Sequence, residues 1–206
     1  MDKLVERLVN AVQNSPGGIA MLETLESLKL CDGFTLKTTL SRLSKSGKLI
    51  RLKRGVYSTN PIRDAFAAAQ RTYNGYIGFS SALYIHGLIA ELPFAVTIVT
   101  VNKSTSKVFG MYEFRSVALK EKAIGFEDIN GLTVSTKAKT LFDCIYLEKY
   151  SVERDKLINA YRVARLNREE LKEFESYVNR FIKAKRRSIF DKIKKTIIGK
   201  GGFYGT

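Results

Sequence analysis

The chain has 206 residues, 45% of them hydrophobic, and a formal net charge of +15 at pH 7. That length suits one large domain or two small ones, and the hydrophobic content is ordinary for a globular protein. The start of the chain does not resemble a signal peptide, and no apolar run reaches the roughly 20 residues of a membrane span. We therefore expect a cytoplasmic protein without a membrane partner, whose positive charge suits a polyanion.

The first 34 residues predict two short helices. Apolar residues between positions 4 and 12 recur at helical spacing behind Asp2, a possible N-cap, and Pro16-Gly17-Gly18 ends that helix. A second apolar series, made of Ile19, Leu22, Leu25, Leu28 and Leu30, predicts another helix. A short turn, Cys31-Asp32-Gly33, then leads to the next element.

A strongly basic segment follows at residues 35–54. Its basic side chains are Lys37, Arg42, Lys45, Lys48, Arg51, Lys53 and Arg54, and it contains no acidic one. Leu36, Leu40 and Leu43 recur at helical spacing, so one helix face can be buried while a cationic, hydroxyl-rich face stays exposed. Like charges on one face repel one another, and a polyanion offsets that repulsion through counterion release.

A basic hairpin is predicted directly after this helix, with strands at residues 49–52 and 56–58. They flank Lys53-Arg54-Gly55, where glycine can adopt the positive φ of a tight turn. The order of helix, helix, basic helix and hairpin is that of a winged helix-turn-helix, which we expect over residues 1–60. Its candidate DNA-binding residues are Lys37, Thr38, Ser41, Arg42 and Lys45 on the helix, and Lys48, Arg51, Lys53 and Arg54 around the hairpin.

These residues divide into two expected roles. Thr38, Ser41, Arg42 and Lys45 would face base edges or groove walls, while Lys48, Arg51, Lys53 and Arg54 would hold phosphates. Double-stranded DNA is therefore the expected partner. An RNA, a protein partner or a merely solvated basic surface are the alternatives.

Residues 61–206 predict a second domain. Asn60-Pro61 suits the start of a helix, and residues 75–88 suggest an extended piece, a serine cap and a helix of two turns that glycine ends. Strands are expected at residues 95–101 and 108–117, and a hairpin at Asn130-Gly131. We expect an α+β protein in which the winged helix precedes a small, mostly antiparallel sheet with surrounding helices and a helical C-terminus.

The C-terminal third predicts helices. Ser135-Thr136 can cap the first, Ser151 can cap a second that runs to residue 165, and Asn167 with Glu170 makes a capping-box-like start to a third. Residues 180–200 form a cationic amphipathic tail with isoleucines at four-residue spacing. Such a tail can be a solvated rim, a membrane-surface segment or a docking element for an acidic partner.

Residue types that catalyse reactions or bind metals are sparse. The single histidine, His86, and the distant Cys31 and Cys144 do not make a usual zinc set, and both cysteines are expected to be reduced thiols. The segment around Ser80 and Ser81 nearly matches a nucleophile elbow, but its second glycine is replaced. We therefore expect no catalytic residue, no metal and no cofactor.

Three segments occur in order at residues 52–57, 78–88 and 131–143. They read LKRGVY, GFSSALYIHGL and GLTVSTKAKTLFD. Together they resemble the AbiEi-type antitoxins of type IV toxin–antitoxin systems over about residues 1–170. The resemblance implies a winged helix that represses its own promoter and a C-terminal domain that counters a nucleotidyltransferase-like AbiEii toxin, usually without a stable complex. The resemblance also implies that His86 has a structural role, at the corner where the connecting helix packs.

Two other functions stay open at this point. Carboxylates in the β-rich middle could hold magnesium for a DNA-processing nuclease. They are Glu113, Glu121 beside Lys122, and Glu127 beside Asp128. The other alternative is a stand-alone winged-helix transcription regulator without a toxin. For the antitoxin as well as for these alternatives, we expect a monomer or a weak dimer.

Overall fold

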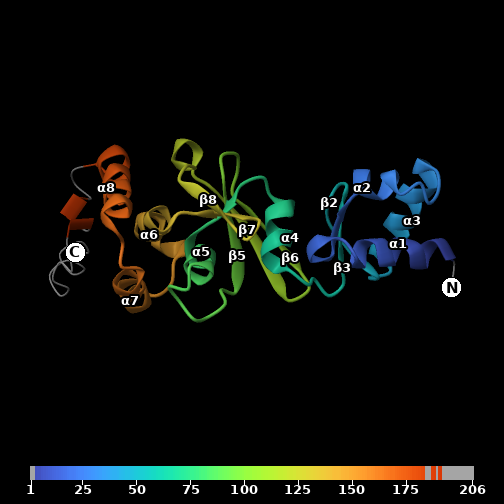
Figure 1. Ribbon diagram of the computed structural model, residues 1–206, viewed down its shortest axis with the longest axis horizontal. Helices are drawn as coiled ribbons and strands as arrows, with labels where there is room; N and C mark the ends of the chain where they lie inside the picture. The colour runs from blue at the N-terminus through green and yellow to red at the C-terminus, as the bar shows by residue number, and fades with distance from the viewer. Residues whose placement is uncertain (1–2, 184–186, 189, 192–206) are drawn as a thin grey trace.

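The computed structural model describes residues 3–183, 187–188 and 190–191, and it is α+β with two sheets (Figure 1). A small sheet with the N-terminal helices lies at one end of an elongated molecule, a larger sheet in the middle, and the C-terminal helices at the other end. None of the helices in this described part combines the length and the apolar surface that crossing a bilayer requires.

The N-terminal part consists of three α-helices and three strands. In chain order its elements are α1 (Lys3–Gln13), the short turn η1 (Pro16–Gly18), β1 (Ile19–Met21), α2 (Leu22–Ser27), α3 (Gly33–Lys45), β2 (Leu49–Lys53) and β3 (Val56–Thr59). The sheet is antiparallel with the order β1-β3-β2. The predicted hairpin is confirmed, and Gly55 in its turn has a φ of 78°.

The predicted second helix is wrong at both ends. Its first three residues form β1 instead, and α2 ends before Leu28 and Leu30. Ile19 pairs with Ser58 of β3, and its side chain packs in an apolar cluster with Leu52 and Val56 of the same sheet. Strand pairing and burial therefore override the helical spacing of the leucines.

Helix α3 follows the predicted pattern. Oδ1 of Asp32 accepts hydrogen bonds from the backbone N–H groups of Phe34 and Thr35, both at 3.0 Å, and so caps the first turn. The buried side of the helix consists of Leu36, Leu40 and Leu43, as predicted. They pack in one cluster with residues of α1, α2, β2 and β3.

The small sheet is covered on both faces. One face lies over α1, α2 and α3. On the other face, Ile50, Leu52 and Val56 share an apolar cluster with α4 (Ala65–Thr72) and with Phe114 of the larger sheet. The N-terminal part and the middle of the molecule therefore share a hydrophobic core.

The expected helix start at Asn60-Pro61 is wrong. Helix α4 begins at Ala65, and Asp64 caps it by accepting a hydrogen bond from the N–H of Ala67 at 2.9 Å. Nδ2 of Asn60 instead donates to the carbonyl oxygen of Gly47 at 2.7 Å. A tertiary partner 13 residues earlier in the chain thus uses the side chain that could have capped a helix.

In the part of the chain that the structure describes, the larger sheet has six strands and is mixed. They are β4 (Tyr76–Ile77), β5 (Ala95–Thr100), β6 (Thr105–Phe109), β7 (Tyr112–Ala118), β8 (Phe126–Ile129) and β9 (Leu132–Ser135), in the order β6-β7-β5-β4-β9-β8. The β5–β7 and β4–β9 pairs are parallel and the other three pairs are antiparallel. The Asn130-Gly131 hairpin is confirmed, with a positive φ at both turn residues.

The expected serine cap on the next helix is wrong. Helix α5 (Phe79–Ile85) starts after Gly78, which caps it without a side chain. Oγ of Ser81 donates to the carbonyl oxygen of Ala95 at 3.2 Å and accepts the N–H of Thr97 at 2.9 Å. This buried serine therefore anchors α5 to β5, which local capping rules do not predict.

The C-terminal helices cover the side of the sheet that α5 also covers. They are α6 (Lys137–Tyr146), α7 (Arg154–Ala164) and α8 (Arg168–Phe181). Short 3₁₀ turns lie before β8, as η2 (Lys120–Lys122), and before α7, as η3 (Glu148–Tyr150). The predicted Thr136 cap and the Asn167–Glu170 capping box are confirmed. Ser151 is not the cap of α7, because Glu153 takes that position. Most of the predicted basic tail lies outside the described residues.

Candidate nucleic-acid interface

The exposed side of α3 carries the residues predicted to face base edges. Arg42 and Lys45 are exposed, whereas Thr38 and Ser41 are half-buried. Their side of the helix lies opposite the buried leucines, as the helical periodicity requires. Lys37 is also exposed, but its ammonium lies 3.4 Å from a carboxylate oxygen of Glu26. Within the described part of the chain, the Lys37 side chain is therefore paired with α2, unlike the other predicted residues of α3.

An aromatic side chain outside the predicted set of nine residues lies on the same side. Phe34 is 82% exposed in the first turn of α3. It precedes Thr38, Ser41 and Lys45 by four, seven and eleven residues, so the four side chains form one stripe along the helix. Phenylalanine can contact the methyl group of thymine in the major groove. The same spacing that selected Thr38 could have found Phe34.

The predicted phosphate-binding residues of the hairpin differ in their surroundings. Arg51 and Arg54 are exposed, while Lys53 is partly buried and its Nζ donates to Oδ1 of Asn74 at 3.5 Å. Asn74 follows α4, so Lys53 lies at the junction with the larger sheet. The N–H of Leu22 donates to the carbonyl oxygen of Gly55 at 2.8 Å, which holds the turn against the start of α2.

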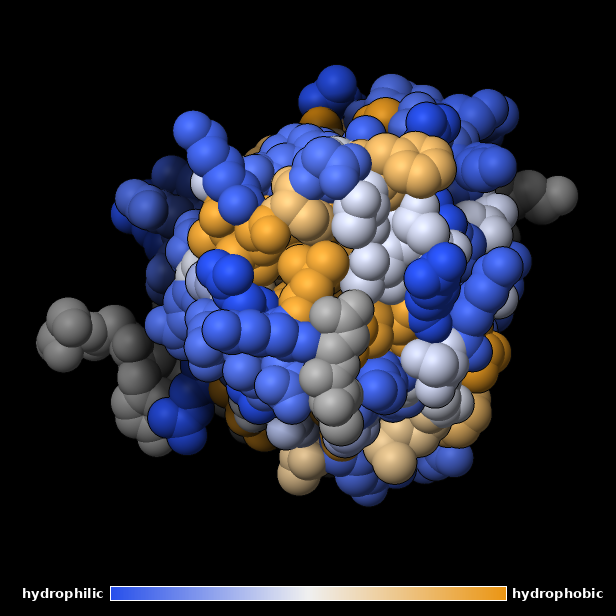
Figure 2. Space-filling view, turned by 90° about the vertical axis from the view of Figure 1, so that its right-hand side faces the viewer, coloured by the Kyte–Doolittle hydropathy of each residue, from blue (hydrophilic) through white to orange (hydrophobic). Residues whose placement is uncertain are grey.

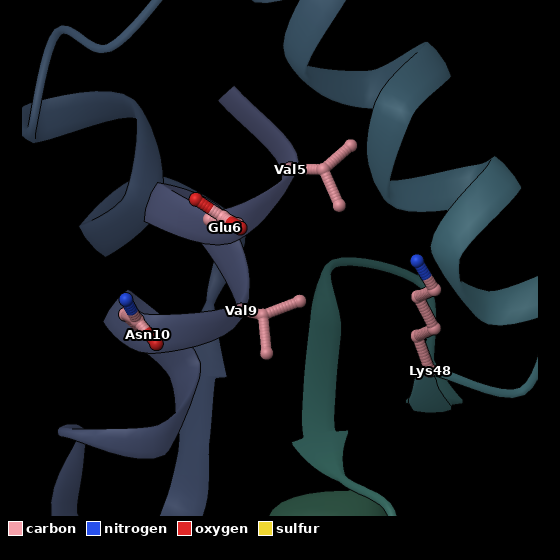
Figure 3. A pocket seen from close by; sticks show the side chains of 5 residues that line it. All are labelled: Val5, Glu6, Val9, Asn10 and Lys48. Carbon is pink, nitrogen blue, oxygen red and sulfur yellow. The ribbon is translucent and has the colours of Figure 1, made fainter. Parts of the chain in front are cut away.

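Lys48 lies in a groove beside α1. The groove is lined by Val5, Glu6, Val9, Asn10 and Lys48 (Figure 3). Val5 and Val9 project from α1 toward the side on which Lys48 lies. Figure 2 shows that hydrophobic side chains gather in the middle of this end of the molecule, with hydrophilic ones around them. Lys48 is therefore a cation in a groove that also contains two valines and the polar side chains of Glu6 and Asn10.

The nine predicted DNA-binding residues thus form a central set and outlying members. Thr38, Ser41, Arg42 and Lys45 share one side of α3. Of the others, Lys37 pairs with α2, Lys48 borders the α1 groove and Lys53 contacts the segment after α4.

Among the residues considered for catalysis or zinc binding, Ser81 and Cys144 are buried and His86 is half-buried. Nε2 of His86 lies 2.7 Å from the carbonyl oxygen of Ser135, so His86 ties the end of α5 to β9. Cys144 is buried, which raises the pKa of its thiol to about 12. Ser81 makes the two backbone contacts to β5 described above.

The carboxylates considered for a magnesium site are dispersed. Glu113 pairs with Arg115 at 2.9 Å, and Glu121 pairs with Lys122 at 2.5 Å. Oδ1 of Asp128 accepts the N–H of Gly131 at 3.0 Å in the hairpin turn. In the part of the chain that the structure describes, no three His, Cys, Asp or Glu side chains gather as metal ligands do.

A buried ion pair lies on α6, within the sequence segment of residues 131–143. Nζ of Lys139 lies 2.5 Å from both carboxylate oxygens of Asp143, one turn later on α6. The side chains are 0% and 1% exposed. The rings of Phe142 and Tyr177 lie 5.7 Å from the ammonium. Burial raises the pKa of Asp143 to about 6, although the charge of Lys139 opposes that shift.

The comparisons with known proteins give no family. No model of a known protein family matches the chain, and a search of curated proteins finds no significant match. The assignment of a function therefore depends on the residues and their arrangement.

Proposed function

We propose that this protein binds double-stranded DNA with a winged helix-turn-helix at residues 1–60. The observation that carries the proposal is the exposed side of α3, where Arg42 and Lys45 lie beside hydroxyl groups and an exposed aromatic ring. In such domains the second helix of the motif enters the major groove, and side chains on its outer side read base edges. The hairpin at Lys53-Arg54-Gly55 would be the wing that contacts backbone phosphates.

The charge distribution supports a nucleic acid as the ligand. Residues 35–54 contain seven basic side chains and no acidic one. Of these residues, Arg42, Lys45, Arg51 and Arg54 are exposed, and no ion pair is found for them within the described residues. Releasing counterions from DNA favours binding to such a surface, and this favours DNA over a neutral partner.

We further propose that the protein is an AbiEi-type antitoxin that represses its own promoter and counters a nucleotidyltransferase-like toxin. This part of the proposal rests on the three ordered segments in the sequence. The second of them contains α5, whose C-cap is His86, and the third contains β9 and the part of α6 that holds the Lys139–Asp143 pair. The stand-alone regulator is the alternative, and the presence of a neighbouring toxin gene decides between the two.

The DNA-binding proposal is tested with the Arg42→Ala variant. A good bidentate contact to guanine contributes roughly 1 to 3 kcal/mol of discrimination. We expect Arg42→Ala to weaken binding to the promoter duplex far more than binding to a shuffled duplex of the same composition. Gel shifts at fixed salt concentration measure both affinities. Lys172→Ala on α8, which is also exposed, is the control and should leave both affinities unchanged.

The antitoxin proposal needs a cellular measurement. Growth of cells that express the neighbouring nucleotidyltransferase should be restored by the full chain. A wild-type protein that shifts the promoter but restores no growth would support the stand-alone regulator. A wild-type protein that shifts no duplex would contradict the winged-helix proposal.

A further inference from the structure

Three positive side chains from three elements come together where the small sheet meets the larger one. They are Lys53 at the end of β2, Arg71 in the last turn of α4 and Lys107 on β6. Burial lowers the pKa of Lys53, and the charges of Arg71 and Lys107 lower it further. Arg71 and Lys107 are therefore each close enough to Lys53 for their charges to act on it.

The apolar core shared by the two parts holds these side chains in place. Leu52, the neighbour of Lys53, packs in the same cluster as Ala69 of α4 and Phe109 of β6. Nζ of Lys53 also reaches Asn74, three residues beyond Arg71. The convergence is thus a consequence of how the sheets are packed.

Within the described residues, these three side chains are not paired with carboxylates. Arg71 and Lys107 are exposed. Like charges held together without a counter-charge cost free energy, and an anion bound between them removes that cost.

We propose that Lys53, Arg71 and Lys107 bind backbone phosphates of the same DNA duplex that α3 reads. The inference rests on the proposed DNA binding and extends the contact surface from the wing onto α4 and β6. Lys53 belongs to the turn region of the expected wing, whereas Arg71 and Lys107 lie beyond residue 60. The three residues therefore connect the wing with α4 and β6. Phosphate contacts of this kind set orientation and affinity and carry no sequence information.

The proposal predicts a property that a surface limited to residues 1–60 does not have. The logarithm of the DNA affinity falls with the logarithm of the salt concentration by about 0.9 per phosphate contact. Removing the charges of Arg71 and Lys107 should therefore lower the slope by about 1.8. At 0.1 M salt, the affinity should fall on the order of 10- to 100-fold for promoter and shuffled duplexes alike.

The experiment compares two double variants of the full chain by fluorescence anisotropy over a series of salt concentrations. The test variant is Arg71→Ala with Lys107→Ala. The control is Arg162→Ala with Lys172→Ala, which removes the same two residue types from exposed positions of α7 and α8 at the other end of the molecule (Figure 1). Circular dichroism establishes that both variants fold.

The outcomes separate this inference from the proposed function. A reduced slope in the test variant alone supports the phosphate cluster. Equal slopes in the wild type and the test variant overturn it, and the dependence on Arg42 then still supports DNA binding through α3. The inference is also overturned if the test variant loses affinity for a duplex RNA of the same sequence but keeps its affinity for DNA. If the wild type binds no duplex, the proposed function fails and this inference fails with it.

Discussion

The exposed ring of Phe34 gives the most specific expectation at the scale of single residues. If this ring contacts a thymine methyl group, replacing that thymine by deoxyuridine should weaken wild-type binding by about 0.8 kcal/mol, the value of one buried methyl group. Phe34→Ala should bind the two duplexes equally well. Gel shifts with singly substituted duplexes measure this coupling.

The matched control for Phe34 is Phe126→Ala. Phe126 is also an exposed aromatic residue, but it lies on β8 of the larger sheet. This variant should discriminate thymine from deoxyuridine as the wild type does. If Phe34→Ala keeps the full discrimination at every position, the ring does not read thymine.

The Lys139–Asp143 pair gives an expectation for stability. Lys139→Met leaves the carboxylate of Asp143 buried without its counter-charge, which should lower the free energy of unfolding by about 3 to 5 kcal/mol. Replacing both residues, as Lys139→Met with Asp143→Leu, should recover most of that loss. Denaturant unfolding measures the three free energies. A single variant as stable as the wild type would contradict a stabilising role for the pair.

The same variant should depend on pH in a defined direction. Burial without Lys139 raises the pKa of Asp143 in the folded state above its ordinary value of 3.8, so the folded state holds a proton that the unfolded state has released. Stability is then lost as the pH rises between the unfolded and the folded pKa. We expect Lys139→Met to be more stable relative to the wild type at about pH 5 than at about pH 8.

At the scale of elements, the β4–β5 pair depends on a close approach of two backbones. A Cβ atom on Gly75 would lie 1.9 Å from the carbonyl oxygen of Val99, which pairs with Tyr76. Gly75→Ala should therefore push β4 from β5 and destabilise the protein by roughly 1 to 3 kcal/mol or more. Thermal unfolding measures the effect. Gly33→Ala, where the nearest atom would be 3.9 Å away, is the control and should unfold near the wild-type temperature.

At the scale of the whole molecule, the shared core limits where the chain can be divided into fragments that fold on their own. A fragment of residues 1–60 would expose Ile50, Leu52 and Val56, which pack against α4 in the full chain. We expect this fragment to unfold at a lower temperature than the full chain and to bind DNA more weakly. A fragment of residues 1–74, which adds α4, should be more stable. Circular dichroism and gel shifts compare the two.

The complementary fragment tests where the proposed antitoxin activity would reside. Residues 61–206 lack α3 and should lose promoter binding, but they retain the segment from β8 to α8. If antitoxicity belongs to this part, the folded fragment should restore growth in cells that express the toxin. A folded fragment that fails while the full chain succeeds would contradict that division.

Local sequence signals predicted the elements that depend on neighbouring residues. The leucine spacing of α3, the Asn130-Gly131 hairpin and the capping box at Asn167 are all present in the structure. Each is decided by residues within a few positions of one another, because helical periodicity, positive φ and capping are local properties. The exposed position of Arg42 and Lys45 follows from the same periodicity.

Tertiary contacts decided the features that sequence patterns missed. Ile19 belongs to β1 because β3 pairs with it, and Asn60 does not cap a helix because Gly47 accepts its hydrogen bond. The partners of these residues lie 39 and 13 positions away in the chain. The meeting of Lys53 with Arg71 and Lys107 likewise exists only because the small sheet packs on α4. The sequence by itself determined the charge of this protein and the elements whose signals are local, such as α3, the Asn130-Gly131 hairpin and the start of α8. Packing between distant segments decided the other element boundaries and which charges lie together.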